Sequence, residues 1–308
     1  MIKNLVTVIL PVFNCAEYVS KAIESILTQT YSNLELIILN DGSTDNSEQV
    51  IKSFTDERIK YISSVQNTKK IGIVNDALGL VNGEFLAFQD ADDWSHPERL
   101  VKQVEALLSN EELIICFTGY DLSGSKNEKK KYRIEDALLK NEFHQLGFLN
   151  PGDYFPTVCA TMMLRTSILP KENGYHPWFA GRVGEDLHWV YRILKYGKGF
   201  TIPQSLYYYR YKRPGSFTYQ LENSADSLLL YSVKVLSKII QLDIENNIDI
   251  LSAPEIDKTK LELDACKECL VEASNKVVLT TNLYKNSNSY RVGNFLLYPF
   301  KWLQSKFK

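Results

Sequence analysis

The sequence has no excess of either charge and few cysteines, and both scarcities narrow the classes of protein that it can encode. Its formal net charge is -2 and its isoelectric point is near 6.2, which argues against a general nucleic-acid binder. The five cysteines are odd in number and scattered, which suits a reducing compartment better than a disulfide framework. Cys266 and Cys269 form a CxxC pair, but no second pair follows it as a zinc site would require.

The sequence also lacks a long hydrophobic run. No stretch reaches the roughly 20 apolar residues that a membrane-spanning helix needs. The apolar start, MIKNLVTVILPVF, is followed too soon by Asn14 and Glu17 for a secretory signal peptide. We therefore expect a cytoplasmic protein, and 308 residues that are 44% hydrophobic suffice for one large core or two domains.

Strand and helix patterns alternate through the first hundred residues. Apolar runs at 5–12, 34–39, 59–62 and 85–88 are typical of buried strands. Residues 15–30, 45–54 and 71–81 between them have helical spacing, with Asn14 as a candidate helix cap. Strands that alternate with helices imply an α/β fold with a parallel, doubly wound sheet. The carboxyl ends of such strands share one edge, so Asn14, Asp41 and the acids after residue 88 should converge there.

Three carboxylates, Asp90, Asp92 and Asp93, follow the fourth of these strands within four residues. No positive charge follows them in the sequence until Arg99. Carboxylates this crowded repel one another unless a cation joins them, and a hard divalent ion such as Mg²⁺ or Mn²⁺ fits oxygen ligands. The alternative is that these acids form a turn and cap a helix before Pro97.

The order and spacing of three segments resemble family 2 glycosyltransferases. The segments are VTVILPVFN, then AIESILTQTYSNLELIILNDGSTDNS, then NGEFLAFQDADDW. The resemblance resumes at Gly184-Glu185-Asp186 and at Tyr209-Arg210. It implies a GT-A fold, with a Rossmann-like and mostly parallel doubly wound sheet, over residues 1–222. Residues 223–308 would then form a helical C-terminal extension.

The resemblance implies a nucleotide-sugar donor, with a UDP-sugar favoured. Asp41 matches the family's aspartate that hydrogen-bonds uracil, and a carboxylate suits a ring N–H. Pro11, Phe13 and Asn14 would wall the nucleoside. Phe13 could stack on the base or could be an ordinary core aromatic.

The acidic cluster is similar to the family's DxD motif, and the resemblance implies a role for each acid. Asp92 would reach the ribose hydroxyls, and Asp93 would hold the Mn²⁺ or Mg²⁺ that bridges the diphosphate. Asp90 would support this site or bind as a further ligand. Arg210 and Lys212 match a basic segment that approaches the diphosphate in related enzymes.

The resemblance makes Asp186 the general base for an inverting, single-displacement transfer. From local sequence alone, an acid here could simply interact with the positive end of the helix dipole. The QxxRW motif of processive synthases is absent, which favours transfer of a single sugar. The acceptor would be a saccharide or a lipid-linked saccharide of bacterial surface-polysaccharide synthesis. The alternatives are a non-catalytic nucleotide-sugar-binding protein and a metal-dependent phosphotransferase.

The second half of the chain is less regular. Strands are expected at 113–117, 158–164 and 205–211, a helix at 187–196, and an exposed Lys-rich loop at 122–136. Residues 170–185 carry Tyr175, Trp178 and Phe179, which could form a sugar platform or pack beneath a loop.

Amphipathic helices follow from residue 224, and the chain ends in FLLYPFKWLQSKFK. Basic and aromatic residues together suit a membrane interface, so we expect peripheral attachment to the inner face of the cytoplasmic membrane. The alternative is that this tail packs on the core or on a second subunit.

Overall fold

A computed structural model describes residues 1–123, 131–132, 138–139, 159–180, 184–210 and 213, and single positions between 235 and 275. The chain divides into two compact units, Met1–Ser252 and Ala253–Lys308. Lys212, the tail after residue 275 and the boundary expected at 222 all lie outside the described residues.

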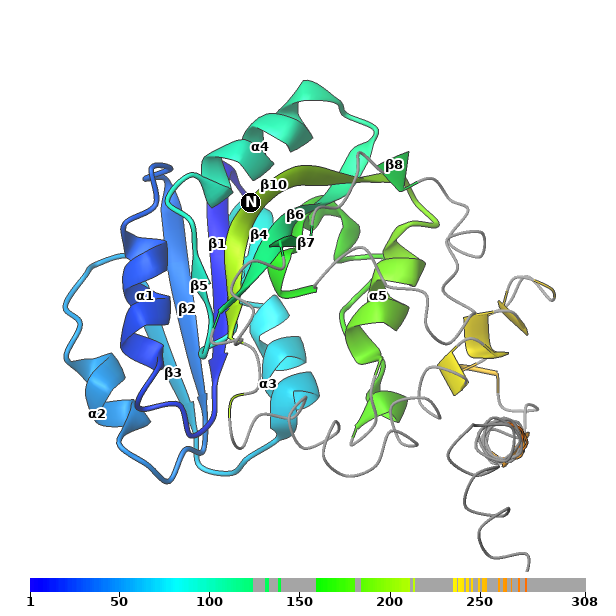
Figure 1. Cartoon of the computed structure of the whole chain (residues 1–308), viewed down its shortest axis with the longest axis horizontal. Helices are drawn as coiled ribbons and strands as arrows, with labels where there is room; N and C mark the ends of the chain where they lie inside the picture. The colour runs from blue at the N-terminus through cyan, green and yellow to red at the C-terminus, as the bar shows by residue number, and fades with distance from the viewer. Residues whose placement is uncertain are drawn as a thin grey trace, which may run out of the picture. The chain divides into compact units, whose positions relative to one another are not determined.

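The first unit is built on one mixed sheet (Figure 1). Its strands follow the order β3-β2-β1-β4-β9-β6-β10-β5. The bounds of the longer strands are β1 Ile2–Val12, β2 Leu34–Asp41, β3 Ile59–Ser64, β4 Gly83–Phe88, β6 Leu113–Ser123 and β10 Lys198–Arg210. The expected parallel arrangement of the first four strands is confirmed, because β1 pairs in parallel with both β2 and β4, and β2 with β3.

Register brings the carboxyl ends of three strands to one edge, as expected. Val12 of β1 lies opposite Asn40 of β2, and Ile9 lies opposite Phe88 at the end of β4. The loops that carry Asn14, Asp41 and the three acids therefore leave the sheet on the same side.

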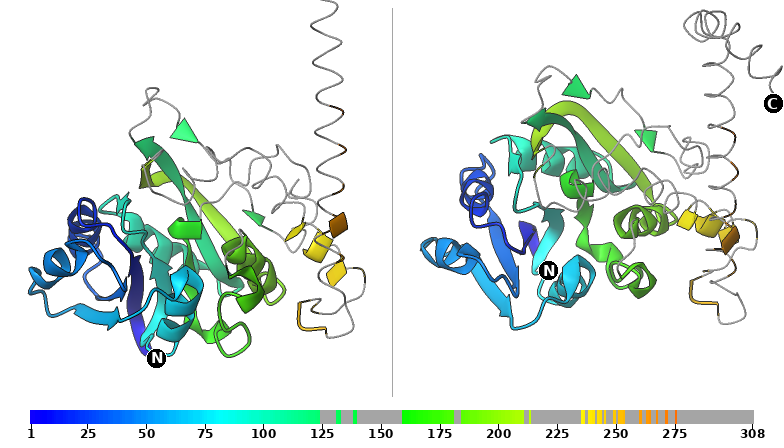
Figure 2. Two further views of the ribbon diagram at one scale, coloured as in Figure 1. Left: turned by 90° about the horizontal axis from the view of Figure 1, so that it is seen from below. Right: turned by 60° about the horizontal axis from the view of Figure 1, so that its bottom comes forward.

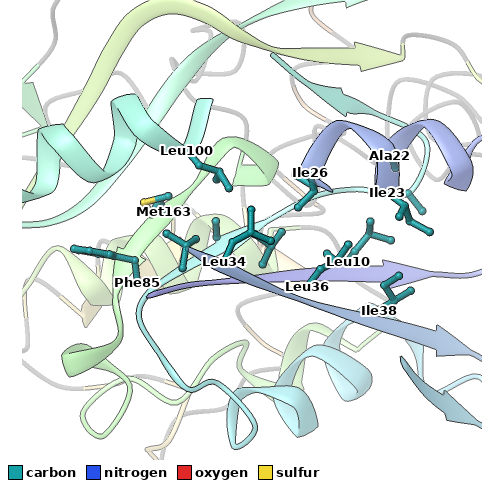
Figure 3. Close-up of a cluster of buried hydrophobic side chains, with 14 of the residues drawn as sticks. Leu10, Ala22, Ile23, Ile26, Leu34, Leu36, Ile38, Phe85, Leu100 and Met163 are labelled. Atoms are coloured by element: carbon teal, nitrogen blue, oxygen red, sulfur yellow. The ribbon is translucent and has the colours of Figure 1, made fainter. Parts of the chain in front are cut away.

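Helices cover both faces of the sheet (Figure 2). Their bounds are α1 Val19–Leu27, α2 Ser47–Lys52, α3 Lys69–Leu78, α4 Arg99–Ser109 and α5 Glu185–Ile193. The main core lies under α1, α2 and α4, where Ile23 and Ile26 of α1 meet alternate residues of β1 and β2 (Figure 3). This one-sided packing follows from the two-residue period of a strand and the helical spacing of α1.

The opposite face is covered by α3 and α5. Phe88 meets the Trp189 ring edge to face, with ring centroids 6.0 Å apart, and Trp189 is fully buried. Because Phe85 and Ala87 of β4 point into the main core, Phe88 points to the other face. The doubly wound arrangement is thus present in the first unit.

Two expectations about local structure are wrong. Asn14 does not cap α1, because that helix begins at Val19 with Tyr18 in the cap position. Residues 159–161 form a 3-10 helix, η2 Cys159–Thr161, and only the short strand β9 Met163–Arg165 follows. That strand runs antiparallel to both β4 and β6, and β5 Trp94–Ser95 runs antiparallel to β10. Strands this short carry too few residues to show a period in sequence.

The loop expected at 122–136 is not a loop where it is described: β6 extends to Ser123, and Lys131–Tyr132 form the short strand β7, which pairs with β6. A further short strand, β8 Leu138–Leu139, pairs with β10. The expected helical pattern after residue 224 agrees with the structure where it is described. Val235, Ile239 and Ile240 are helical and buried. Within the described part of the chain, no helix is both long and apolar enough to cross a membrane.

Candidate active site

Asp41 ends β2 and faces the edge of the sheet where the loops converge. Its side chain is only 3% exposed, and Oδ1 accepts hydrogen bonds from the backbone N (2.7 Å) and hydroxyl (3.1 Å) of Thr68. The next residue, Gly42, has a φ of +68°, and a Cβ there would lie 3.0 Å from the backbone N of Asn67. A glycine is therefore required for the chain to turn this closely past the residues that lead into α3.

The loop after β1 is tied to the loop after β2. Asn14 has a φ of +49°, and its Oδ1 accepts from the backbone N of Thr44 at 2.8 Å. Pro11 is partly buried in β1, whereas Phe13 is 44% exposed. The alternative of a core aromatic is therefore wrong for Phe13, and its ring is available to a ligand.

Asp93 is the most deeply buried of the three acids, at 2% exposure. Its Oδ2 accepts from the hydroxyl of Tyr207 at 2.9 Å, and its Oδ1 accepts from the backbone N of Arg210 at 2.7 Å. Burial, and then the charges of Asp92 and Asp90, hold the pKa of Asp93 well above its usual range. Both oxygens of Asp93 thus serve to tie the acidic loop to β10.

Asp92 is paired with a cation from beyond β10. Oδ2 lies 2.8 Å from Nε of Arg213, and the backbone carbonyl accepts from Nε of Arg210 at 2.8 Å. Burial and then the charge of Asp90 raise the pKa of Asp92, and Arg213 partly offsets them. The guanidinium of Arg210 lies over Tyr18 and Trp94, 4.6 and 5.2 Å from the ring centroids, which fixes its position.

Asp90 is paired with Lys70, near the start of α3, whose Nζ lies 3.2 Å from Asp90 Oδ1. Burial lowers the pKa of Lys70, but the charges of Asp90, Tyr175, Asp186 and Glu185 raise it well above its usual value. Lys70 therefore lies within electrostatic reach of the acidic loop and of the first turn of α5.

The first turn of α5 places Glu185 and Asp186 beside each other. Burial and then the charge of Asp186 raise the pKa of Glu185 to about 7, and Lys70 partly offsets them. Asp186 Oδ1 accepts from the backbone N of Leu187 at 2.8 Å. Two adjacent carboxylates, one of which titrates near neutrality, are suited to accepting a proton from a bound hydroxyl.

The cation nearest to the acids along the chain does not pair with them in the structure. Arg99, the nearest cation along the chain, is fully buried, and its guanidinium donates to the carbonyls of Phe88 and Ala160. Lys70 and Arg213, which are distant in sequence, neutralise the acids instead.

The donor set fits a divalent cation that takes only a few ligands from the protein. Asp90 and Asp92 are oxygen donors whose mutual repulsion is visible in the raised pKa of Asp92. In the described ranges, no three histidine, cysteine or acidic side chains gather as a metal cage. A metal here would therefore need ligands from a bound anion, such as the phosphate oxygens of a nucleotide.

Most aromatic side chains of the segment before α5 pack in the interior and do not form a surface for sugar binding. Tyr175 is 3% and Phe179 is 1% exposed, so the packing alternative holds for both rings, while Trp178 is only partly buried. Tyr175 packs edge to face on Trp189, at 5.2 Å between ring centroids.

Three contributors to the site were missed at the level of sequence: Lys70, Tyr207 and Trp94. Lys70 follows no recognisable motif, and Tyr207 is one of several tyrosines in β10. The strand pattern of β10 shows which tyrosines alternate, but only the position of the acidic loop shows that Tyr207 meets Asp93.

The chain was compared with protein families and curated proteins. Residues 7–169 match the family described as Glycosyl transferase family 2. The putative glycosyltransferase EpsE of Bacillus subtilis strain 168 is 31% identical over 228 residues, which are 71% of this chain and 79% of EpsE. The Escherichia coli protein WfgD, a UDP-Glc:alpha-D-GlcNAc-diphosphoundecaprenol beta-1,3-glucosyltransferase, is 37% identical over 138 residues, which are 45% of this chain and 54% of WfgD.

Solved structures share the fold at low sequence identity. Staphylococcus aureus TarS 1-349 in complex with UDP-GlcNAc has a TM-score of 0.61 and 19% identity, over 86% of this chain and 71% of TarS 1-349. The mannosyltransferase PcManGT from Pyrobaculum calidifontis, in complex with GDP-Man and Mn2+, has a TM-score of 0.56 and 15% identity, over 94% of this chain and 83% of that protein.

Proposed function

Because the chain belongs to glycosyl transferase family 2, and is thus a glycosyltransferase with a GT-A fold, we propose that it transfers a single sugar from a nucleoside-diphosphate sugar with inversion. The favoured donor is a UDP-sugar. The observation that carries the proposal is the convergence of Asp41, the acidic loop and the Glu185–Asp186 pair around the start of α3.

Donor binding is assigned to the loops after β1 and β2. Thr68 donates two hydrogen bonds to Asp41 Oδ1 and so fixes the carboxylate. Oδ2 can then accept a hydrogen bond from the N–H of a base. Phe13 offers an exposed ring for stacking, while Pro11 and Asn14 form the wall behind it. Arg210 and Lys212 remain proposed contacts of the diphosphate.

Asp92 and Asp90 are the carboxylates that would hold Mn²⁺ or Mg²⁺ in this proposal. The resemblance assigned the metal to Asp93, with Asp90 as a further ligand, and the ribose to Asp92. Each Asp93 oxygen accepts one hydrogen bond, from Tyr207 or from the backbone of Arg210, and keeps a second lone pair for a metal. When bound, the metal would supply positive charge beside the departing diphosphate. Arg213 and Lys70 add fixed positive charge on the same side.

Asp186 is the proposed general base. It would take the proton of the acceptor hydroxyl while that oxygen attacks the anomeric carbon from the face opposite the diphosphate. A single displacement of this kind inverts the anomeric centre and requires no nucleophile from the protein. Glu185 would orient the acceptor.

The proposed acceptor is a saccharide or a lipid-linked saccharide of surface-polysaccharide synthesis. The name of WfgD specifies a diphosphoundecaprenol acceptor, which supports this class. Peripheral attachment at the inner face of the cytoplasmic membrane would bring the site to such an acceptor. The tail proposed to attach lies outside the described residues.

The two alternative functions, a phosphotransferase and a non-catalytic binder, differ in outcome. A phosphotransferase is wrong for a member of this family, and β1 ends in Val12 without the carboxylate that such a mechanism would use. A non-catalytic nucleotide-sugar binder of the same fold remains an outcome of the experiment below.

The test is a thermal-shift panel of UDP, GDP, dTDP and CMP, each with Mn²⁺ or with EDTA. A ligand at a hundred times its dissociation constant adds about 2.7 kcal/mol to the free energy of unfolding. A rise with UDP that requires Mn²⁺ supports the proposal, and release of UDP from a UDP-sugar then separates the enzyme from the binder. A rise with GDP alone would overturn the donor base, and no rise with any nucleotide would overturn the donor site.

A further inference from the structure

Helix α3 contacts the nucleoside end of the proposed site, the acidic loop and the segment before α5. Its cap residue, Thr68, donates to Asp41 at the nucleoside end. Lys70 pairs with Asp90 at the acidic loop. Asn75 exchanges two hydrogen bonds with the backbone of Tyr175, at 2.7 and 2.8 Å, in the segment that leads to α5.

The backbone beside Lys70 is specialised for this arrangement. Lys69 has a φ of +62°, which a residue with a side chain rarely adopts, and its N–H donates to Asn67 Oδ1 at 2.8 Å. Gly174 has a φ of +102°, and a Cβ there would collide with the Asn75 side chain. These features fix the start of α3, where Lys70 lies, and the contact of the helix with the segment before α5.

Lys70 is also accessible. Its side chain is 37% exposed, so a ligand in the site can reach the ammonium group. Asp90, its partner, is 27% exposed. A partly exposed cation is therefore paired with the acidic loop.

We propose that Lys70 is a positioning residue which acts as the counter-ion of the acidic loop. It occupies Asp90 in the ligand-free protein, and so it disfavours a free divalent cation. When a nucleoside diphosphate enters, Lys70 offsets the phosphate charge. The consequence is that metal and nucleoside diphosphate bind together rather than metal first. This inference rests on the proposed function.

The charge argument predicts opposite effects on two ligands. Removal of a cation makes the site more negative, which favours Mn²⁺ and disfavours UDP. A variant that merely damages the site would weaken both. Affinity changes of opposite sign for Mn²⁺ and UDP therefore distinguish an electrostatic role of Lys70 from a structural one.

The experiment uses calorimetric titration of the full chain with Mn²⁺ alone, and with UDP at saturating Mn²⁺. We expect Lys70→Met to bind Mn²⁺ about two- to fivefold more tightly and UDP about two- to fivefold more weakly, as for a partly exposed charge. Lys70→Arg should restore both affinities toward the wild type. Lys102→Met is the matched control, because Lys102 is 39% exposed and lies 3.9 Å from Glu105 on α4.

Each result decides a different claim. If Lys70→Met matches Lys102→Met, or if it weakens both ligands, the counter-ion role is wrong while the proposed function stands. If the wild type binds neither Mn²⁺ nor UDP, the proposed donor site is wrong, and the inference is wrong with it.

Discussion

The hydroxyl of Tyr207 donates to Asp93 Oδ2 over 2.9 Å, and so it links β10 to the acidic loop after β4. The hydroxyl oxygen of Tyr207 also accepts hydrogen bonds from the side chain of Gln89 and from the backbone N of Asp90. Tyr207 is fully buried, so water cannot replace these bonds when the hydroxyl is removed.

Tyr207→Phe is therefore expected to lower the free energy of unfolding by about 1–3 kcal/mol, because it leaves buried polar groups without a partner. Urea unfolding at neutral pH measures the change. The matched control is Tyr208→Phe, since Tyr208 stacks on Trp94 with ring centroids 5.2 Å apart and is less buried. Equal losses in the two variants would show that the hydroxyl of Tyr207 has no special role.

Asp92→Asn and Asp93→Asn distinguish the two candidate metal ligands. We expect Asp92→Asn to abolish the part of the thermal shift with UDP that requires Mn²⁺. Asp93→Asn should retain at least part of that shift, because the proposal assigns the metal to Asp92 and Asp90 while Asp93 links the acidic loop to Tyr207 and to the backbone of Arg210. The reverse pattern would restore Asp93 as the metal ligand.

Asp186→Asn should leave nucleotide binding unchanged and lower transfer by roughly 10²–10⁴-fold, the usual contribution of a general base. Release of the nucleoside diphosphate from the donor sugar measures transfer, and the thermal shift measures binding. Asp56→Asn is the control, because Asp56 pairs with Arg58 before β3, an edge strand of the sheet. Undiminished transfer in Asp186→Asn would remove Asp186 from the base role.

The burial of His188 predicts that the free energy of unfolding falls in acid. Both ring nitrogens are buried without a hydrogen-bond partner, and burial, with a smaller effect of the Arg192 charge, lowers the pKa of His188 to about 3. The folded protein therefore holds His188 neutral, while the unfolded chain protonates it below about pH 6.5. Its contribution is complete above that pH and is lost progressively as the pH falls toward 3.

The measurement is the free energy of unfolding of the wild type and of His188→Phe at pH 7 and pH 5. We expect the variant to gain about 2 kcal/mol relative to the wild type between the two pH values, since each pH unit below 6.5 costs about 1.4 kcal/mol. The other titrating groups are common to both proteins and cancel in the difference. The same pH dependence in both proteins would contradict a neutral, buried His188.

Local pattern was enough to predict the first half of the fold. Apolar runs of four to eight residues, separated by helical spacing, predicted the four parallel strands and the edge at which Asn14, Asp41 and the acids meet. Three of those strands, β1, β2 and β4, are buried on both faces over most of their length, so burial dictates their sequence and makes it readable without coordinates. The exposure of Phe13 was not readable, because an aromatic after a strand suits a core and a binding site equally.

The chemistry within the site was decided by tertiary structure. The sequence by itself determined which residue types reach the sheet edge, and the resemblance of its motifs added a role for each. Only the packed chain decided that Tyr207 and the backbone of Arg210 occupy Asp93, and that Lys70 and Arg213, rather than Arg99, neutralise its neighbours. The physical reason is that a charge interacts with what lies nearest in space, and Lys70 and Arg213 reach these acids only after α3 and β10 have packed on the sheet.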